Sequence, residues 1–230
     1  MCGRFVILDP EMIIRKYNIQ KKPAFTFTAR YNIAPSQEIP IVLRDTANRL
    51  ELMKWGLIPF WAKDPDIGNR MINARAETLA EKPSFRSSLK SKRCLIPASG
   101  FYEWKEVGGR KMPYLIKLKD TPLFSFAGLY DIWLDEQKQE IKTFTIITTV
   151  ANDYLAPIHN RMPVIFNEHD ENLWLDKSID TGKLITLLNP YPSEFMEAYS
   201  VSPAVNNIKN DSVDLIKPIE SDDSYNQQLF

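Results

Sequence analysis

The chain has 230 residues, of which 44% are hydrophobic and 25% are charged, and its formal net charge at pH 7 is zero. This length and apolar content allow one globular domain with a substantial core. No run of about 18 apolar residues is present to span a bilayer, and the N-terminus lacks the apolar stretch of a signal peptide. We therefore expect a cytoplasmic protein with no membrane partner, in which Cys2 and Cys94 do not form a disulfide.

The charges are unevenly distributed along the chain. Residues 1–130 contain 22 Lys/Arg and 12 Asp/Glu, a balance of +10, whereas residues 131–230 contain 7 and 17, a balance of −10. A local basic face suits phosphate contacts. A folded surface on which both halves interleave explains the same distribution equally well, so charge alone favours neither interpretation.

The first expected element is a strand over residues 2–8, which begins almost at the N-terminus. A residue as small as Cys2 permits removal of Met1, which would leave an α-amine of pKa about 8 beside a thiol of pKa about 8.5. Such a 1,2-aminothiol condenses with an aldehyde to an imine, and the thiolate then closes a thiazolidine ring. From position alone, an ordinary buried or frayed cysteine is the commoner outcome.

Short elements follow in quick succession. Asp9 and Pro10 begin a short helix, with Asp9 as its N-cap. Residues 31–35 predict a turn, and residues 38–44 and 50–57 predict the two strands of a hairpin. The proline-stiffened loop at 58–62 carries aromatic side chains, which either stack on unpaired bases or pack in the core.

The middle of the chain contains its densest basic run. Residues 73–78 predict the beginning of a helical stretch, and residues 82–93 then carry five cationic side chains and no acid. A solvated helix face explains this run as well as a phosphate-binding face does. Further strands are expected at 99–104, 114–118 and 123–130, with a hairpin turn at 107–110.

The last third adds one interior strand and several short segments. The β-branched residues of 143–149 are typical of a buried strand. The remaining predicted elements are a helix or turn at 152–158, a strand at 164–166, helices at 168–175 and 181–188, and extended chain at 199–205. We therefore expect an α+β fold with a mostly antiparallel, barrel-like β-sheet and short flanking helices.

Few side chains are suited to chemistry, and each has an ordinary structural explanation. Glu103 lies between aromatic residues but could be a surface carboxylate, and His159 could cap a helix. Asn73 and Arg75 supply an amide and a guanidinium. The two cysteines and two histidines have no zinc spacing, and the chain has no phosphate-binding loop, dinucleotide fingerprint or Gly-x-Ser-x-Gly motif. We expect no metal and no cofactor.

Seven short motifs nevertheless occur in a recognisable order. They are Met-Cys-Gly-Arg-Phe at 1–5, Asn-Ile-Ala-Pro at 32–35, Trp-Gly-Leu-Ile-Pro-Phe-Trp at 55–61, Asn-Ala-Arg-Ala-Glu at 73–77, Ile-Pro-Ala-Ser-Gly-Phe-Tyr-Glu-Trp at 96–104, Phe-Ala-Gly-Leu at 126–129 and His-Asn-Arg-Met-Pro at 159–163. Together they resemble the SRAP family, SOS-response-associated proteins that shield abasic sites in DNA. The resemblance implies one domain over residues 1–206, followed by an acidic tail at 207–230 that is surface-packed or partly disordered.

The resemblance also implies a mechanism. Processed Cys2 would capture the ring-opened sugar aldehyde of an abasic site as a thiazolidine DNA–protein crosslink. Glu103 would be the general acid/base of ring opening, imine closure and slow reversal, because a carboxylate between aromatic residues has a raised pKa. His159 would protonate the departing sugar oxygen or support β-elimination, a lyase reaction, and Asn73 would orient the Cys2 end. These four are the expected catalytic residues.

A set of DNA-binding residues is carried over in the same way. The arginines would clamp phosphates and the apolar members would border the flanking bases, in the set Arg4, Asn32, Pro35, Trp61, Arg75, Arg86, Arg161 and Met162. Few of these side chains can read base edges, so we expect little base specificity. The expected partner is single-stranded DNA with abasic sites, bound by a monomer that associates with the nucleoid.

Two other functions remain open. An N-terminal cysteine with Asn, Glu and His nearby could serve an N-terminal-nucleophile cysteine peptidase or amidase, with the α-amine as base. Turnover of an amide without any aldehyde would favour that function. The chain could instead be a non-catalytic single-strand-binding module in which Cys2 is structural, and it would then retain neither intact nor abasic strands under denaturing conditions.

Overall fold

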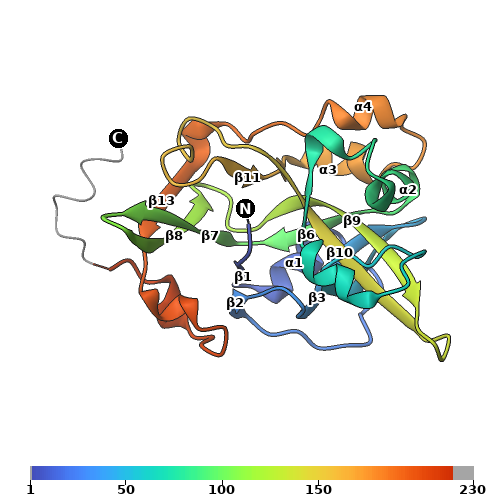
Figure 1. Cartoon of the computed structure of the whole chain (residues 1–230), viewed down its shortest axis with the longest axis horizontal. Helices are drawn as coiled ribbons and strands as arrows, with labels where there is room; N and C mark the ends of the chain where they lie inside the picture. Colours follow the sequence, from blue (N-terminus) through green and yellow to red (C-terminus); the bar gives the residue numbers. More distant parts are fainter. Residues whose placement is uncertain (1, 220–230) are drawn as a thin grey trace.

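The computed structural model describes residues 2–219 (Figure 1). The strands are β1 (Phe5–Ile7), β2 (Arg30–Ile33), β3 (Glu38–Arg44), β4 (Asn48–Trp55), β5 (Asn73–Arg75), β6 (Arg93–Ala98), β7 (Gly100–Val107), β8 (Arg110–Leu118), β9 (Phe124–Leu134), β10 (Glu140–Val150), β11 (Arg161–Pro163), β12 (Ile165–Phe166) and β13 (Met196–Ser200). The helices are α1 (Pro10–Lys16), α2 (Pro83–Ser91), α3 (Glu168–Leu175) and α4 (Thr181–Ile185), with short 3₁₀ helices η1 (Pro65–Arg70), η2 (Ala76–Thr78), η3 (Ser193–Phe195), η4 (Pro203–Asn206) and η5 (Val213–Ile216).

Five strands close into a barrel. In the order β10, β4, β3, β6, β9, each strand pairs with the next, and β9 pairs back with β10. Only the β10–β4 pair of this ring is parallel. Aromatic rings fill the core, with Phe5 packing edge-to-face on Trp55 at 5.2 Å and on Phe126 at 5.8 Å between ring centroids. The expected α+β fold with a mostly antiparallel, barrel-like sheet is confirmed.

A second sheet, in the order β13-β8-β7-β1-β2, extends from the barrel and lies to its left in Figure 1. Its strand β1 is buried on both faces: Phe5 and Ile7 belong to the main core, and Val6 belongs to a smaller core with Tyr102 and Leu215. Because β1 lies between β2 and β7, the N-terminal end of the chain is held inside the sheet.

Helices α2 and α3 pack against β6 and β9 of the barrel. Asp9 caps α1 as expected, since its side chain accepts a hydrogen bond of 3.0 Å from the Met12 amide. Helices α2, α3 and α4 gather near one end of the barrel, at the upper right of Figure 1. None of the helices between residues 2 and 219 is long and apolar enough to cross a membrane.

Two local predictions were wrong. Residues 31–35 were expected as a turn, but β2 continues to Ile33, which pairs with Phe5 of β1, and of the expected range only Pro35 lies in the turn that follows. Residues 73–78 were expected to be helical, but β5 occupies 73–75 and only a single 3₁₀ turn, η2, follows. Asn73 and Arg75 pair in parallel with Ile146 and Thr148 of β10. In both cases, pairing with a strand distant in sequence overrides the local preference.

The C-terminal segment, defined as residues 203–216, lies against β2 and β8 (red-orange in Figure 1). Leu215 is 3% exposed and belongs to the smaller core with Val6 and Tyr102. The chain then continues with a bridge between Pro218 and Val201. Of the tail expected at 207–230, residues 207–219 therefore pack on the sheet, and residues 220–230 lie outside the described residues.

Candidate functional site

Cys2 is fully buried at the start of the chain, where β1 and β7 set its surroundings. Phe5 pairs with Phe101, and the Tyr102 amide donates to the Arg4 carbonyl at 2.9 Å, so the antiparallel register continues toward the N-terminus. This register brings Cys2 alongside the part of β7 that contains Glu103. The Asn73 side-chain amide also donates a hydrogen bond of 2.8 Å to the Cys2 carbonyl oxygen.

Glu103 is a carboxylate inside the protein, with 4% of its surface exposed. Burial raises the pKa of Glu103, and the nearby imidazole of His159 opposes that rise. Burial also raises the pKa of the Cys2 thiol well above its ordinary range, and the charge of Glu103 adds to this effect. The thiol and the carboxyl group are therefore close enough to influence each other, and both environments favour the protonated forms.

His159 follows a series of turns after β10 and lies two residues before Arg161, the first residue of β11. The Arg161 amide donates to His159 Nδ1 at 3.0 Å, and the Arg161 carbonyl oxygen lies 3.2 Å from the same nitrogen. His159 and Glu103 line one cavity of about 380 Å³, together with Trp104, Lys111 and Asn206. A buried acid and an imidazole on the same cavity are suited to moving protons at a bound substrate.

The four expected catalytic residues are thus contiguous, although they come from four separate parts of the chain. Asn73 contacts Cys2 directly, Cys2 is within the electrostatic influence of Glu103, and Glu103 shares a cavity with His159. In the part of the chain that the structure describes, no cluster of His, Cys, Asp and Glu has the arrangement of a metal site.

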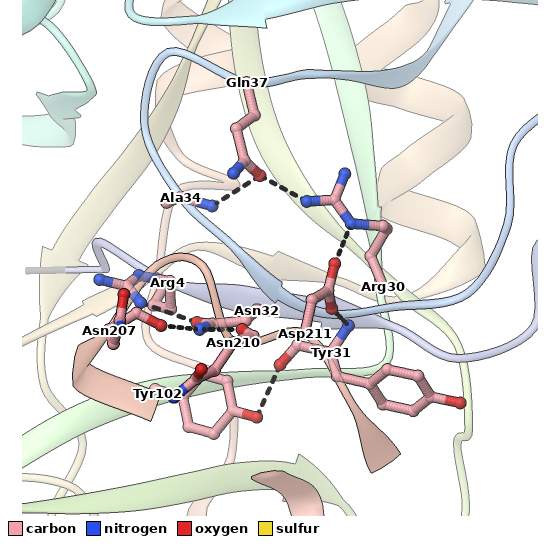
Figure 2. A network of polar contacts seen from close by, with 10 residues as sticks. All are labelled: Arg4, Arg30, Tyr31, Asn32, Ala34, Gln37, Tyr102, Asn207, Asn210 and Asp211. Atoms are coloured by element: carbon pink, nitrogen blue, oxygen red, sulfur yellow. Dashed lines mark hydrogen bonds and ion pairs between the residues drawn. The ribbon is translucent and has the colours of Figure 1, made fainter. Parts of the chain in front are cut away.

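Arg4 and Asn32 form the centre of a polar network (Figure 2). Arg4 Nη1 donates to Asn32 Oδ1 at 2.7 Å and to the Val205 carbonyl at 2.8 Å. The Arg4 guanidinium also lies over the Trp104 ring, 5.9 Å from its centroid. Burial lowers the pKa of Arg4 from its ordinary value. Asn32, expected among the DNA-binding residues, is fully buried, and its amide is directed at the protein's own chain.

Two further members of the expected DNA-binding set also face inward. Arg161 Nη1 and Nη2 donate to the two carboxylate oxygens of Glu77 at 2.5 and 2.9 Å, and Nη2 also donates to the Thr148 carbonyl at 2.7 Å. The hydrogen bond from Arg161 lowers the pKa of Glu77. Met162 is fully buried in the main core. A phosphate would therefore have to compete with Glu77 for Arg161.

The remaining members lie at the surface. Trp61 is 47% exposed beside Phe60, which is 55% exposed, so two large aromatic side chains project from the same loop. Arg75 at the end of β5 and Arg86 on α2 are exposed, and Pro35 is half-buried. Of the basic run at 82–93, Arg93 is buried and donates to four backbone carbonyls at the ends of α2 and α3.

Three residues of the cavity were not predicted from the sequence. Trp104 Nε1 donates to Asn206 Oδ1 at 2.8 Å, and Lys111 lies on β8, the strand paired with β7. Trp104 could have been found, because it follows Glu103 in one of the motifs. Asn206 lies about a hundred residues away in sequence and carries no motif signal, so only the fold brings it to the site.

A family model described as SOS response associated peptidase (SRAP) matches residues 1–208. The chain belongs to the SRAP family. It is 50% identical over 222 residues to the abasic site processing protein YoqW of Bacillus subtilis (strain 168), with 94% of this chain and 99% of YoqW covered. It is 36% identical over 260 residues to the abasic site processing protein YMR114C of Saccharomyces cerevisiae, with 97% and 70% covered.

A solved structure shares the fold. A crystal structure of a protein from Bacteroides thetaiotaomicron superposes with a TM-score of 0.88 at 31% identity, covering 95% of this chain and 100% of that one. The SRAP membership expected from the seven motifs is therefore confirmed. The family match ends at residue 208, within the C-terminal segment.

Proposed function

We propose that this SRAP protein processes abasic sites in single-stranded DNA by capturing the ring-opened sugar aldehyde at Cys2 after Met1 is removed. The observation that carries the proposal is the setting of Cys2, whose carbonyl is held by Asn73 and whose thiol lies within the influence of Glu103. Similarity over nearly the whole chain to YoqW, which is named an abasic site processing protein, supports the substrate class.

The first step joins the sugar to the protein. The free α-amine of Cys2 attacks C1′ of the aldehyde to give a carbinolamine, which loses water to become an imine. Glu103 is suited to supply the proton that the departing hydroxyl needs, because burial raises its pKa and favours the protonated form. Removal of Met1 is essential, since a nitrogen in a peptide bond does not form an imine.

The second step closes the ring. Cys2 Sγ adds to the imine carbon and forms the C–S bond, while the thiol proton passes to the nitrogen, so the whole reaction releases one water. A thiol whose pKa is raised by burial carries that proton at neutral pH. His159 faces the same cavity and is suited to protonate the sugar oxygen on ring opening or to assist β-elimination from the imine.

Binding of the strand would use charge and stacking. Arg4, Arg75, Arg86 and Lys111 offer cations to phosphates, and the exposed Phe60 and Trp61 offer faces to unpaired bases. Contacts to phosphates carry no sequence information, and every base has a face that can stack on an aromatic ring. We therefore propose binding with little sequence preference.

Mass spectrometry of the intact protein tests the proposal directly. Wild-type protein is incubated with an oligonucleotide that contains one abasic site, and with the same strand without it. We expect loss of Met1 and an adduct stable to heat, formed only with the abasic strand and absent in Cys2→Ala. Cys2→Ser, which keeps the amine but not the thiol, should form only an imine that borohydride must trap.

The alternative outcomes are equally specific. Processed wild-type protein that forms no adduct would contradict the crosslinking chemistry, and hydrolysis of amide substrates by the same sample would favour the N-terminal-nucleophile amidase. A heat-stable adduct that persists in Cys2→Ala would contradict the thiazolidine, because this variant keeps the α-amine but has no thiol; Lys111, which lines the cavity, is another amine that could then form it.

A further inference from the structure

We infer that Asn32 is a positioning residue that couples the C-terminal segment to Arg4 and thereby sets the cationic face beside Cys2. The inference rests on the proposed function, because it assigns Arg4 to a DNA phosphate. It replaces the direct DNA contact expected for Asn32 with an indirect one, and it gives residues beyond the family match a role in the site.

Asn32 uses its whole side-chain amide within the protein. Its Nδ2 donates to the carbonyl oxygens of Val205 at 3.2 Å, Asn207 at 3.1 Å and Asn210 at 2.7 Å. Its Oδ1 accepts from Arg4 Nη1 at 2.7 Å. A fully buried amide so placed binds the C-terminal segment with one end and the guanidinium of Arg4 with the other (Figure 2).

A second set of contacts fastens the same segment further along. Asp211 accepts from Arg30 Nε and from the Tyr31 amide, the latter at 2.6 Å, so its carboxylate is held by β2 on the other side of Asn32 (Figure 2). The Tyr102 hydroxyl donates to the Tyr31 carbonyl of β2 at 2.9 Å and lies 3.4 Å from the Leu215 carbonyl of the segment. These contacts define where the segment lies along β2.

The segment in turn touches the site at two points. The Val205 carbonyl accepts from Arg4 Nη1, and Asn206 lines the catalytic cavity while holding the Trp104 indole at 2.8 Å. Trp104 lies under the Arg4 guanidinium. Because Nη1 of Arg4 is held by Asn32 and Val205 and Nε is buried, Nη2 is the nitrogen left to meet a phosphate. Displacing the segment would therefore disturb Arg4, which is two residues from Cys2.

The test is a pair of variants that remove the same charge from the same segment. Asp211→Ala loses the contacts to Arg30 and Tyr31, whereas Asp214→Ala loses only an exposed ion pair with Lys217. Removal of a negative charge by itself strengthens DNA binding. We expect Asp214→Ala to leave affinity for an intact single strand unchanged or slightly higher, and Asp211→Ala to lower it at least about fivefold.

Salt dependence identifies Arg4 as the group affected. Losing one phosphate contact to a single strand reduces the slope of log affinity against log salt by about 0.7. Relative to wild type, Asp211→Ala and Arg4→Ala should reduce the slope by similar amounts. Asn32→Asp, which keeps an acceptor for Arg4 but loses the hydrogen bonds donated to the segment, should lose at least as much of the slope as Asn32→Ala, because its carboxylate also competes with phosphate for Arg4.

Hydrogen exchange measures the coupling without DNA. Asp211→Ala should speed exchange in residues 203–216 and at the Tyr102 amide, which is bonded to the Arg4 carbonyl, and Asp214→Ala should not. Faster exchange in the segment with unchanged affinity and slope would overturn the inference and leave these contacts a structural role. Equal behaviour of Asp211→Ala and Asp214→Ala would also overturn it.

The proposed function can fail while the inference about Asn32 holds, and the experiments distinguish the two. If wild-type protein binds single strands but forms no adduct with abasic DNA, the crosslinking chemistry fails while the difference between Asp211→Ala and Asp214→Ala still supports the inference. If wild-type protein binds no DNA, the exchange at Tyr102 decides the coupling alone, and no change there contradicts it.

Discussion

The side-chain amide of Asn73 donates a 2.8 Å hydrogen bond to the carbonyl oxygen of Cys2, across 71 positions of sequence. Asn73 begins β5, which is fixed by its parallel pairing with β10 of the barrel. Cys2, which carries the proposed nucleophile, is therefore oriented by the barrel as well as by its own sheet. A terminal amine would otherwise have considerable freedom, because chain ends fray unless they are tied down.

Asn73→Ala should slow adduct formation far more than it destabilises the fold. Loss of one hydrogen bond costs about 1 kcal/mol of unfolding free energy, but misplacement of a reacting group by about 1 Å costs on the order of a hundredfold in rate. The rate is measured by intact-protein mass spectrometry with excess abasic oligonucleotide, and stability by urea unfolding.

The control is Asn69→Ala, an exposed residue of η1, the 3₁₀ helix that precedes β5. It should match wild type in both measurements. A rate for Asn73→Ala within about twofold of wild type would show that the contact to Cys2 does not orient the reaction.

The free energy of unfolding of Glu103→Gln, relative to that of wild type, should be higher at neutral pH than at acid pH. Burial raises the folded pKa of Glu103 above the unfolded value of about 4.3. The stabilising contribution of the wild-type carboxyl is thus complete below pH ~4.3 and is lost as the pH rises through the folded pKa. Glutamine does not titrate, so the stability of Glu103→Gln minus that of wild type should grow between about pH 4 and about pH 8.

Urea unfolding of both proteins across this range provides the measurement. The same variant should also slow imine formation, since its amide cannot deliver a proton. If the stability difference stays constant with pH, Glu103 is not the buried, pKa-raised acid that the mechanism requires.

Local signals account for the parts of the fold that the sequence predicted well. The hairpin of β3 and β4, the helix α3 at 168–175 and the turn at 107–110 depend on residues that are neighbours in the chain. Gly108 and Gly109 adopt positive φ at that turn, which is the conformation that glycine favours. The strands β2 and β5 were missed because their extended state depends on pairing with distant β1 and β10.

The candidate site shows the same division. Motifs pointed to Cys2, Glu103 and His159, and the fold brings them to one place. A motif does not show which distant group hydrogen-bonds to each of its polar side chains. The positions of Asn32 and Arg161 depend on carbonyls of the C-terminal segment and on Glu77, which no local pattern connects to them.

Trp61→Ala should weaken binding of single-stranded DNA without changing the chemistry at Cys2. Trp61 is 47% exposed, and stacking of a base on an exposed aromatic side chain contributes about 1–3 kcal/mol. The affinity is measured with intact strands, and the reactivity of Cys2 with a small aldehyde. We expect the affinity to fall by a similar factor for strands of different sequence, since every base has a face to stack.

The matched control is Phe195→Ala, which removes another aromatic side chain, 51% exposed, at η3. Its affinity should equal that of wild type. Strong dependence of the Trp61→Ala effect on the flanking bases would contradict the expected lack of base specificity, and slower reaction with the small aldehyde would indicate damage to the site.

Glu77→Gln should strengthen binding of single-stranded DNA through Arg161. Both carboxylate oxygens of Glu77 hold the Arg161 guanidinium, so the arginine meets a phosphate only by giving up this ion pair. Glutamine accepts a weaker hydrogen bond and carries no charge, so the competition with phosphate declines.

Glu81→Gln removes an equal charge nearby, and the gain in affinity for Glu77→Gln should exceed the gain for Glu81→Gln. In an Arg161→Ala background this excess should disappear, as a double-mutant cycle measures directly. If the excess persists without Arg161, or if Glu77→Gln gains no more than Glu81→Gln, Arg161 serves only to join β11 to η2 and does not contact DNA.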